Sequence, residues 1–120
     1  MENEIEDLLH DLGLCKYERK AYLTLLKHGP QNYKSLSDLS DVPYGKIYSV
    51  MERLAEKGWT KSLNQRPKIF YATDPEEHMY NRLLEMKKEM ASLENTIQRV
   101  SAKLKGLYHH SNPPSEASLT

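Results

Sequence analysis

The segment of residues 42–58, VPYGKIYSVMERLAEKG, carries side chains that suit contacts with nucleic acid. At helical spacing its apolar residues occupy one face, and hydroxyl, basic and small residues occupy the other. Lysine and arginine can neutralise a phosphate or donate to guanine, and serine can bond either type of base. A tyrosine hydroxyl can reach a phosphate or a base edge. The residues of this outer face that we expect to contact DNA are Tyr44, Gly45, Lys46, Tyr48, Ser49 and Arg53.

Two further polar clusters could support such contacts. One occupies a turn between two short apolar runs, where packing gives no reason for a basic residue; its members are Asn64, Gln65, Arg66 and Lys68. The other opens a short helix, whose first backbone N–H groups can bind a phosphate; its members are Tyr33, Lys34 and Ser35. Single residues have simpler alternatives: Lys46 and Arg53 could be ordinary solvated charges, and Tyr48 could serve packing.

The charge distribution favours a local anionic partner although the chain of 120 residues has a formal net charge of zero. Residues 1–15 hold five acidic residues and no lysine or arginine. Residues 16–72 hold eleven Lys/Arg against five Asp/Glu, a balance of +6, and residues 73–120 hold six against seven. Phosphate contacts depend on local charge, so the basic central block predicts where nucleic acid would bind.

The elements that must position these clusters follow from hydrophobic periodicity. Apolar stripes predict helices over residues 2–12, 16–28, 33–40 and 43–57. Pro43 suits a first helical position and Gly58 suits a helix end. We expect the helix at 33–40 to bury Leu36 and Leu39, and the helix at 43–57 to bury Ile47, Val50, Met51 and Leu54. Residues 59–63 and 68–72 are rich in aromatic and β-branched residues and predict a hairpin.

A long helix that opens at Asp74-Pro75 carries a second strong pattern. Its apolar residues alternate at spacings of four and three, which is typical of a coiled coil. We expect this seam to form a homodimer through Met79, Leu83, Met86, Met90, Leu93, Ile97, Val100, Leu104 and Leu107. The alternative is a long amphipathic helix packed on its own domain, but about 30 helical residues extend about 45 Å, too far for this domain to cover.

Flanking charges bear on the orientation of the two helices. In a parallel pair, Arg82 would face Lys87 and Glu89 would face Glu94 of the second copy, so both contacts would join like charges. In an antiparallel pair, Lys87 would face Glu94. Surface ion pairs contribute at most about 1 kcal/mol, so the antiparallel arrangement is a moderate preference.

Several classes of protein are disfavoured. The N-terminus is acidic and lacks the basic region of a signal peptide, and no stretch is apolar enough to cross a membrane. The single cysteine excludes an intramolecular disulfide, and we expect a cytoplasmic protein. The histidines show no metal-ligand spacing apart from the pair His109 and His110, and catalytic motifs are absent. We therefore expect no enzyme activity, no metal and no cofactor, and nothing here implies a small-molecule effector.

Three stretches resemble the N-terminal DNA-binding domain of the TrmB family of archaeal transcriptional regulators. They are LGLCKYERKAYLTLLKHGP, LSDLSDVPYGKIYSVMERLAEKGW and QRPKIFYATDPEE, and the resemblance extends from about Leu12 to Glu77. It implies a winged-helix dimer that binds operator DNA, with helix 43–57 as the recognition helix and residues 64–68 as the wing. Tyr44 and Gly45 depart from the family pattern, so the resemblance implies no base preference. The chain resembles the short, stand-alone members, and sugar sensing is not implied.

Together these patterns predict a mainly α (α+β) winged helix-turn-helix with a two-stranded wing, followed by a long coiled-coil helix. We expect a DNA-binding domain at residues 1–74, a dimerisation helix at 75–108 and a disordered tail at 109–120. The predicted function is sequence-specific binding of double-stranded DNA as a homodimeric transcriptional regulator. The alternative is a winged-helix adaptor that binds proteins and not DNA, which zero net charge and the acidic residues Asp38 and Asp41 favour.

Overall fold

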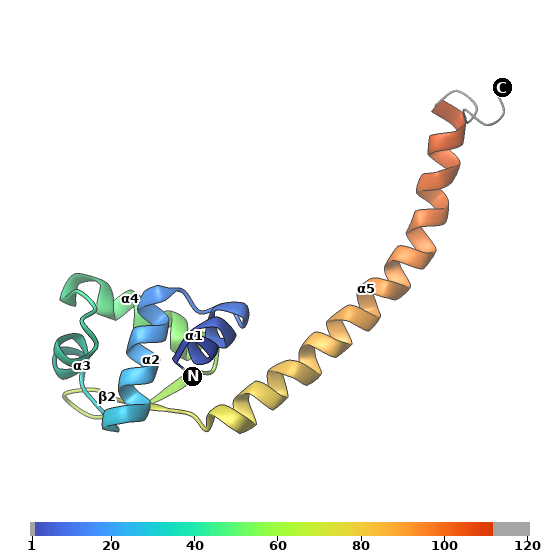
Figure 1. The fold of residues 1–120 in the computed structure, drawn as a ribbon. Helices are drawn as coiled ribbons and strands as arrows, with labels where there is room; N and C mark the ends of the chain where they lie inside the picture. The colour runs from blue at the N-terminus through green and yellow to red at the C-terminus, as the bar shows by residue number, and fades with distance from the viewer. Residues whose placement is uncertain (1, 112–120) are drawn as a thin grey trace. The chain divides into compact units, whose positions relative to one another are not determined.

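The computed structural model describes residues 2–111, and its order of elements is the predicted one (Figure 1). A mainly α winged helix-turn-helix with a two-stranded wing and a long C-terminal helix is therefore confirmed. The elements are α1 (Glu2–Asp11), α2 (Lys16–His28), α3 (Tyr33–Ser40), α4 (Tyr44–Glu56), β1 (Thr60–Leu63), β2 (Ile69–Ala72) and α5 (Pro75–Ser111). Contacts divide the chain into two units after His78, and each unit is described by itself below.

The core of the first unit lies among α2, α3, α4 and the base of the hairpin. The apolar face of α4 is fully buried, as its periodicity predicts. Two aromatic rings close the core, with Tyr22 of α2 and Trp59 before β1 in edge contact at 5.1 Å between ring centroids. The buried apolar residues are Leu9, Leu14, Ala21, Tyr22, Leu25, Leu36, Val42, Ile47, Val50, Met51, Leu54, Trp59 and Phe70.

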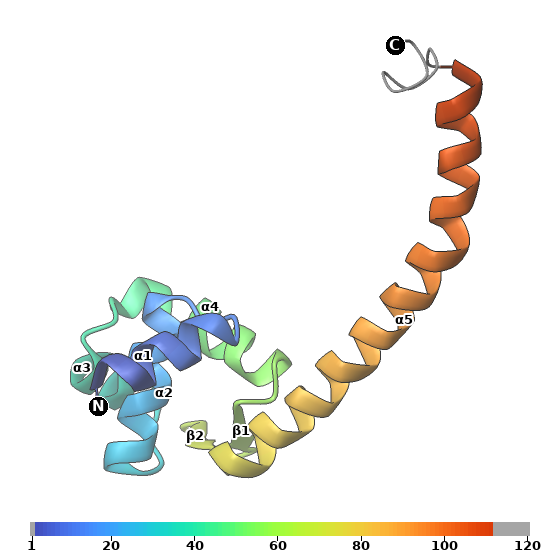
Figure 2. The same cartoon turned by 45° about the vertical axis from the view of Figure 1, so that its right-hand side comes forward.

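The hairpin is antiparallel, with Thr60 opposite Ala72 and Leu63 opposite Ile69 (Figure 2). A bridge ties its base to the loop between α2 and α3. Gln31 and Phe70 exchange both backbone hydrogen bonds, at 3.0 and 2.8 Å between nitrogen and oxygen. Because Phe70 is also buried, the base of the wing is fixed to the helical core while its tip extends into solvent.

The turn between α3 and α4 is held by side-chain hydrogen bonds that the sequence analysis did not predict. The Ser37 hydroxyl donates to the carbonyl of Val42 at 2.6 Å, and the N–H of Val42 donates to the Ser40 hydroxyl at 3.2 Å. Pro43 is the residue that precedes the helix, not its first helical residue, because its ψ of 138° is extended. Its carbonyl still accepts from Ile47 at 3.1 Å and so begins the hydrogen bonds of α4.

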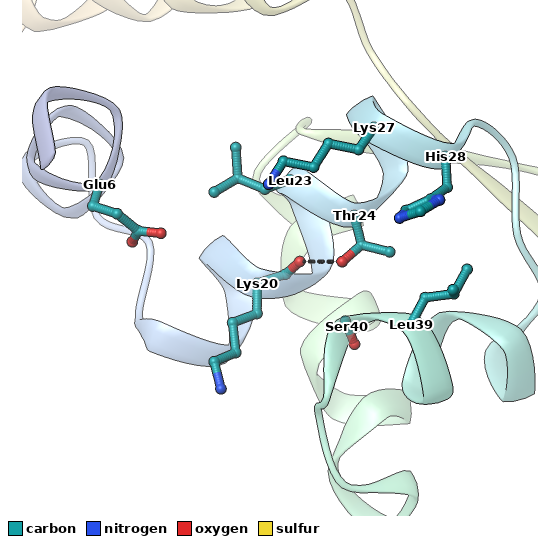
Figure 3. Close-up of a pocket in the computed structure, with 8 residues that line it drawn as sticks. All are labelled: Glu6, Lys20, Leu23, Thr24, Lys27, His28, Leu39 and Ser40. Atoms are coloured by element: carbon teal, nitrogen blue, oxygen red, sulfur yellow. Dashed lines mark hydrogen bonds between the residues drawn. The ribbon is translucent and has the colours of Figure 1, made fainter. Parts of the chain in front are cut away.

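The prediction that Leu39 is buried was wrong, since 47% of its surface is exposed. Leu39 borders an open hollow of about 250 Å³ between α1, α2 and α3. Figure 3 shows Leu39 and Ser40 of α3 facing Thr24 and His28 of α2 across it. Apart from Leu23, the residues that share this lining with Leu39 are polar or charged, which leaves the leucine half exposed.

The long helix α5 begins at Pro75, where the Asp74 carboxylate accepts from the N–H groups of Glu76 at 3.0 Å and Glu77 at 3.3 Å. It continues to Ser111, three residues beyond the expected end. Gly106 lies inside α5, and one glycine costs a helix only about 1 kcal/mol. The remainder of the expected disordered tail, residues 112–120, lies outside the described residues.

The first turn of α5 belongs with the winged unit, so the structural division falls four residues after the expected one at residue 74. The His78 ring contacts Trp59 at 4.3 Å between centroids, and it lies where a side chain on Gly58 would have to go. Gly58 has a φ of 83°, the left-handed conformation expected at the end of the preceding helix. Within the described part of the chain, no helix combines the length and apolar character that a membrane crossing requires.

Candidate nucleic-acid interface

The outer face of α4 presents the expected side chains in its first two turns. Tyr44, Gly45, Lys46, Tyr48 and Ser49 are all exposed. A Cβ atom added to Gly45 would meet nothing within 4 Å, so packing within this unit does not require a glycine there. The first turn of α4 is therefore open to an approaching surface.

Two tyrosines on this face act as a pair. The hydroxyls of Tyr44 and Tyr48 are 2.8 Å apart, and their rings are in edge contact at 5.5 Å between centroids. The hydrogen bond that Tyr48 shares with Tyr44 favours its neutral form and raises the pKa of Tyr48 above its ordinary value. About half of each side chain remains exposed, 50% for Tyr44 and 46% for Tyr48. The pair can offer both a donor and an acceptor to a ligand.

Tyr48 also packs, so the two roles considered for it are compatible. The ring centroids of Tyr48 and Tyr33 are 4.3 Å apart, and those of Tyr33 and Phe70 are 4.7 Å apart. This row of aromatic rings joins the outer face of α4 to the start of α3 and to the base of the wing. The sequence analysis did not predict the row, because its members are distant along the chain.

The polar residues of α4 differ in how they are engaged. Lys46 forms no hydrogen bond or ion pair with another side chain in the described residues, so its charge is available. The Ser49 hydroxyl donates to the carbonyl of Lys46 at 3.1 Å but keeps its acceptor sites. Arg53 is engaged by the protein itself: its Nε is 3.8 Å from a carboxylate oxygen of Glu18. Its Nη2 is 3.9 Å from the sulfur of Cys15.

Glu18 is a buried carboxylate that the sequence analysis did not single out. It accepts from the N–H of Cys15 at 2.8 Å and from Lys57 Nζ at 2.9 and 3.2 Å. Burial by itself raises the pKa of Glu18, but the hydrogen bonds from Cys15 and Lys57 outweigh it, so the pKa lies below the ordinary value of 4.5. A glutamate three residues after a helix-capping position is a capping-box pattern, which was the available signal.

The tip of the wing is polar and exposed. Asn64, Gln65, Arg66 and Lys68 all lie on the surface. Arg66 has no ion-pair partner among residues 2–111, whereas Lys68 lies with its Nζ 5.6 Å from the centre of the Phe70 ring. Arg66 is thus the freer of the two charges.

A groove of about 490 Å³ separates α4 from the wing. Tyr48 on one side and Lys68 on the other both line it, so the outer face of α4 and the wing are neighbours. Glu52 and Glu56 also line the groove. Their negative charge would repel phosphates, so a DNA backbone would have to keep away from these two carboxylates.

The start of α3 offers fewer free donors than expected. The N–H of Ser35 donates to the side chain of Asn32 at 2.9 Å, so a phosphate would have to compete for it. Tyr33 is half-buried in the row of aromatic rings, and Lys34 is exposed. Lys34 is therefore the residue of this cluster best placed to meet an anion.

Among the described residues of its own unit, nothing covers the apolar seam of α5. Met79 and Val100 are half-buried, and the other seven seam residues expected from the sequence are exposed. Arg82 pairs along its own helix with Glu85 at 3.3 Å and Glu89 at 3.0 Å. Among the described residues, no group of three potential ligand side chains could hold a metal ion.

Comparison with known proteins adds a family and a fold. Residues 8–76 match the family model described as the sugar-specific transcriptional regulator TrmB. The chain is 33% identical over 108 residues to the HTH-type sugar sensing transcriptional regulator TrmBL1 of Pyrococcus furiosus. That alignment covers 90% of this chain and 30% of the relative, so the chain spans under a third of the relative's length.

Two solved structures share the fold. One is TrmBL2, described as an archaeal chromatin protein with a novel mode of DNA binding; its TM-score is 0.81 at 19% identity, over 90% of this chain and 42% of that one. The other is reduced AbfR bound to DNA, a protein known from Staphylococcus epidermidis. Its TM-score is 0.52 at 22% identity, over 86% of this chain and 81% of that one.

Proposed function

The chain belongs to the TrmB family of transcriptional regulators, and we propose that it binds double-stranded DNA sequence-specifically as a homodimer. The recognition helix α4 enters the major groove with Tyr44, Lys46, Tyr48 and Ser49, and the wing places Arg66 on the flanking backbone or in the minor groove. The observation that carries this proposal is the exposed outer face of α4 beside the exposed tip of the wing. Lys46 on this face and Arg66 at the tip have no ion-pair partner in the part of the chain that the structure describes.

Dimerisation through α5 is the second part of the proposal. An exposed apolar seam over four heptads is stable in water when a second helix covers it, and a second copy offers a matching seam. Two recognition helices would then engage half-sites about one helical turn of DNA apart, or a multiple of it. The helices of the pair are proposed to be antiparallel, with Lys87 facing Glu94 of the other copy.

A fluorescence-anisotropy titration of labelled random-sequence duplex at about 50 and 200 mM salt tests DNA binding directly. We expect binding that weakens steeply with salt, because phosphate contacts release counterions. Selection from a random DNA pool then identifies the preferred site. Absence of binding at the lower salt concentration would overturn the proposal.

A protein-binding adaptor is the second candidate, and one observation favours it. Glu52 and Glu56 place negative charge in the groove beside the recognition helix, where a basic partner segment could bind. The same titration separates the two candidates, since an adaptor would show no salt-dependent affinity for duplex DNA.

A further inference from the structure

A charge cluster with a buried centre lies at the C-terminal end of the recognition helix, away from the exposed first two turns. Its centre is Glu18, whose surface is only 2% exposed. Lys57 Nζ donates to both oxygens of this carboxylate and also to the carbonyl of Gly13 at 3.0 Å. Arg53 adds a longer ion pair at 3.8 Å. The cluster thus joins the loop before α2, the first turn of α2 and the end of α4.

Lys57 has no hydrogen-bond capacity left for another anion. An ammonium group has three donors, and Lys57 faces three acceptor oxygens at 2.9, 3.2 and 3.0 Å. If Lys57 bound a DNA phosphate, it would leave Glu18 as a buried charge with a weaker partner, which is costly. Arg53 is held less tightly: its Nε faces the Glu18 carboxylate at 3.8 Å and its Nη2 faces the Cys15 sulfur at 3.9 Å.

We propose that Glu18 is a positioning residue for DNA binding: it holds Arg53 and Lys57 on the protein and thereby fixes how α4 presents its first two turns. This inference rests on the proposed function, and it removes Arg53 from the set of DNA contacts that the sequence suggested. Arg53 in α4 and Lys57 directly after it then add nothing to sequence-independent phosphate binding. The helix is instead oriented by a contact between residues 39 positions apart in the chain.

The test measures how the affinity for duplex DNA depends on salt in the full chain and in the variants Lys57→Gln and Arg53→Gln. Arg66→Gln is the control, because it removes an exposed wing charge that has no ion-pair partner among the described residues. We expect the control to reduce the slope of log affinity against log salt by about 1. Lys57→Gln and Arg53→Gln should leave this slope unchanged and lower the ratio of specific to random-sequence affinity by about 2- to 30-fold.

Glu18→Gln gives the converse result, because it releases both cations. In this variant the slope of log affinity against log salt should become steeper by about 1 to 2. Binding to random sequence should be tighter, and the ratio of specific to random-sequence affinity should fall. Thermal unfolding monitored by circular dichroism confirms that each variant is folded. If Glu18→Gln does not fold, the two cation variants carry the test, because their side chains are partly exposed.

The outcomes separate this inference from the proposed function. If Lys57→Gln or Arg53→Gln lowered the slope as much as Arg66→Gln does, the positioning role would be overturned and DNA binding would stand. An unchanged slope together with an unchanged specificity ratio in both cation variants would also overturn it. Failure of the unmodified protein to bind DNA at low salt would overturn the proposed function and the positioning role with it.

Discussion

At the scale of single residues, Lys46 and Arg66 are the basic side chains whose removal should report most directly on DNA contact. Neither has an ion-pair partner within residues 2–111. We expect Arg66→Ala to weaken binding to all sequences alike and to lower the salt slope by about 1, because a wing residue on the backbone contacts phosphate. Anisotropy titrations over a salt series measure this. Lys105→Ala, which removes an exposed charge from α5, is the control and should leave the slope unchanged.

Lys46 should behave differently if it touches a base. Lys46→Ala should cost about 1–3 kcal/mol at one position of the selected site and relax the preference there. The measurement is the affinity for the selected duplex and for single-base variants of it. A uniform loss across all of these sequences would assign Lys46 to the phosphate backbone.

Glu18 makes stability depend on pH in a defined direction. Its pKa in the folded protein is below the ordinary value of 4.5, so its stabilising contribution is complete above about pH 4.5 and is lost as the pH falls through the folded pKa. Glu18→Gln should cost about 1.5–3 kcal/mol at pH 7, as expected for hydrogen bonds to a charged group. Urea unfolding between pH 7 and pH 3 should show the two proteins converging below pH 4.5. A constant difference over that range would contradict this assignment.

At the scale of elements, the seam of α5 should control association. Leu93→Lys places a charge in the seam and should raise the dimer dissociation constant by about 100-fold or more, because a buried leucine contributes about 2–5 kcal/mol. Leu84→Lys is the matched control. The two leucines have similar exposure, 54% and 49%, but Leu84 lies beside the seam. Sedimentation velocity at micromolar concentrations measures both, and equal effects would exclude the predicted seam.

The winged unit illustrates how closely an element's limits can be predicted. The bounds of α2 and α3 match the prediction: Gly29 follows α2, and Asn32 caps the start of α3. The start of α4 was harder to predict from the sequence, because Pro43 suits both the first helical position and the position before it. The hydroxyls of Ser37 and Ser40, which bond across the turn, decide between them.

At the scale of the whole molecule, the orientation of the helix pair is testable with one label site. A Lys105→Cys variant in a Cys15→Ser background carries a single spin label per chain. In an antiparallel pair centred near residues 91–92, the two labels would lie about 40 Å apart, because each residue adds about 1.5 Å of helix. In a parallel pair they would lie within about 20 Å of each other. Double electron–electron resonance distinguishes these distances, and the shorter one would exclude the antiparallel arrangement.

The sequence by itself determined the features that depend on neighbours along the chain. The order of helices and strands, the two faces of α4, the basic turn at residues 64–68 and the apolar seam of α5 all follow from periods of two, three and four residues and from turn residues. The same local patterns carried the family resemblance, which the family model matches over residues 8–76. Local patterns suffice here because hydrogen bonding and burial repeat regularly within each element.

Only the tertiary structure decided which polar residues are free. Arg53 has the spacing of an outward-facing base, yet Glu18, 35 positions earlier in the chain, lies beside its guanidinium. Tyr48 rests on Tyr33 and Phe70, and Leu39 is exposed because polar residues of α2 face it across an open hollow. A side chain's partners depend on which elements fold beside it, and neither periodicity nor composition contains that information.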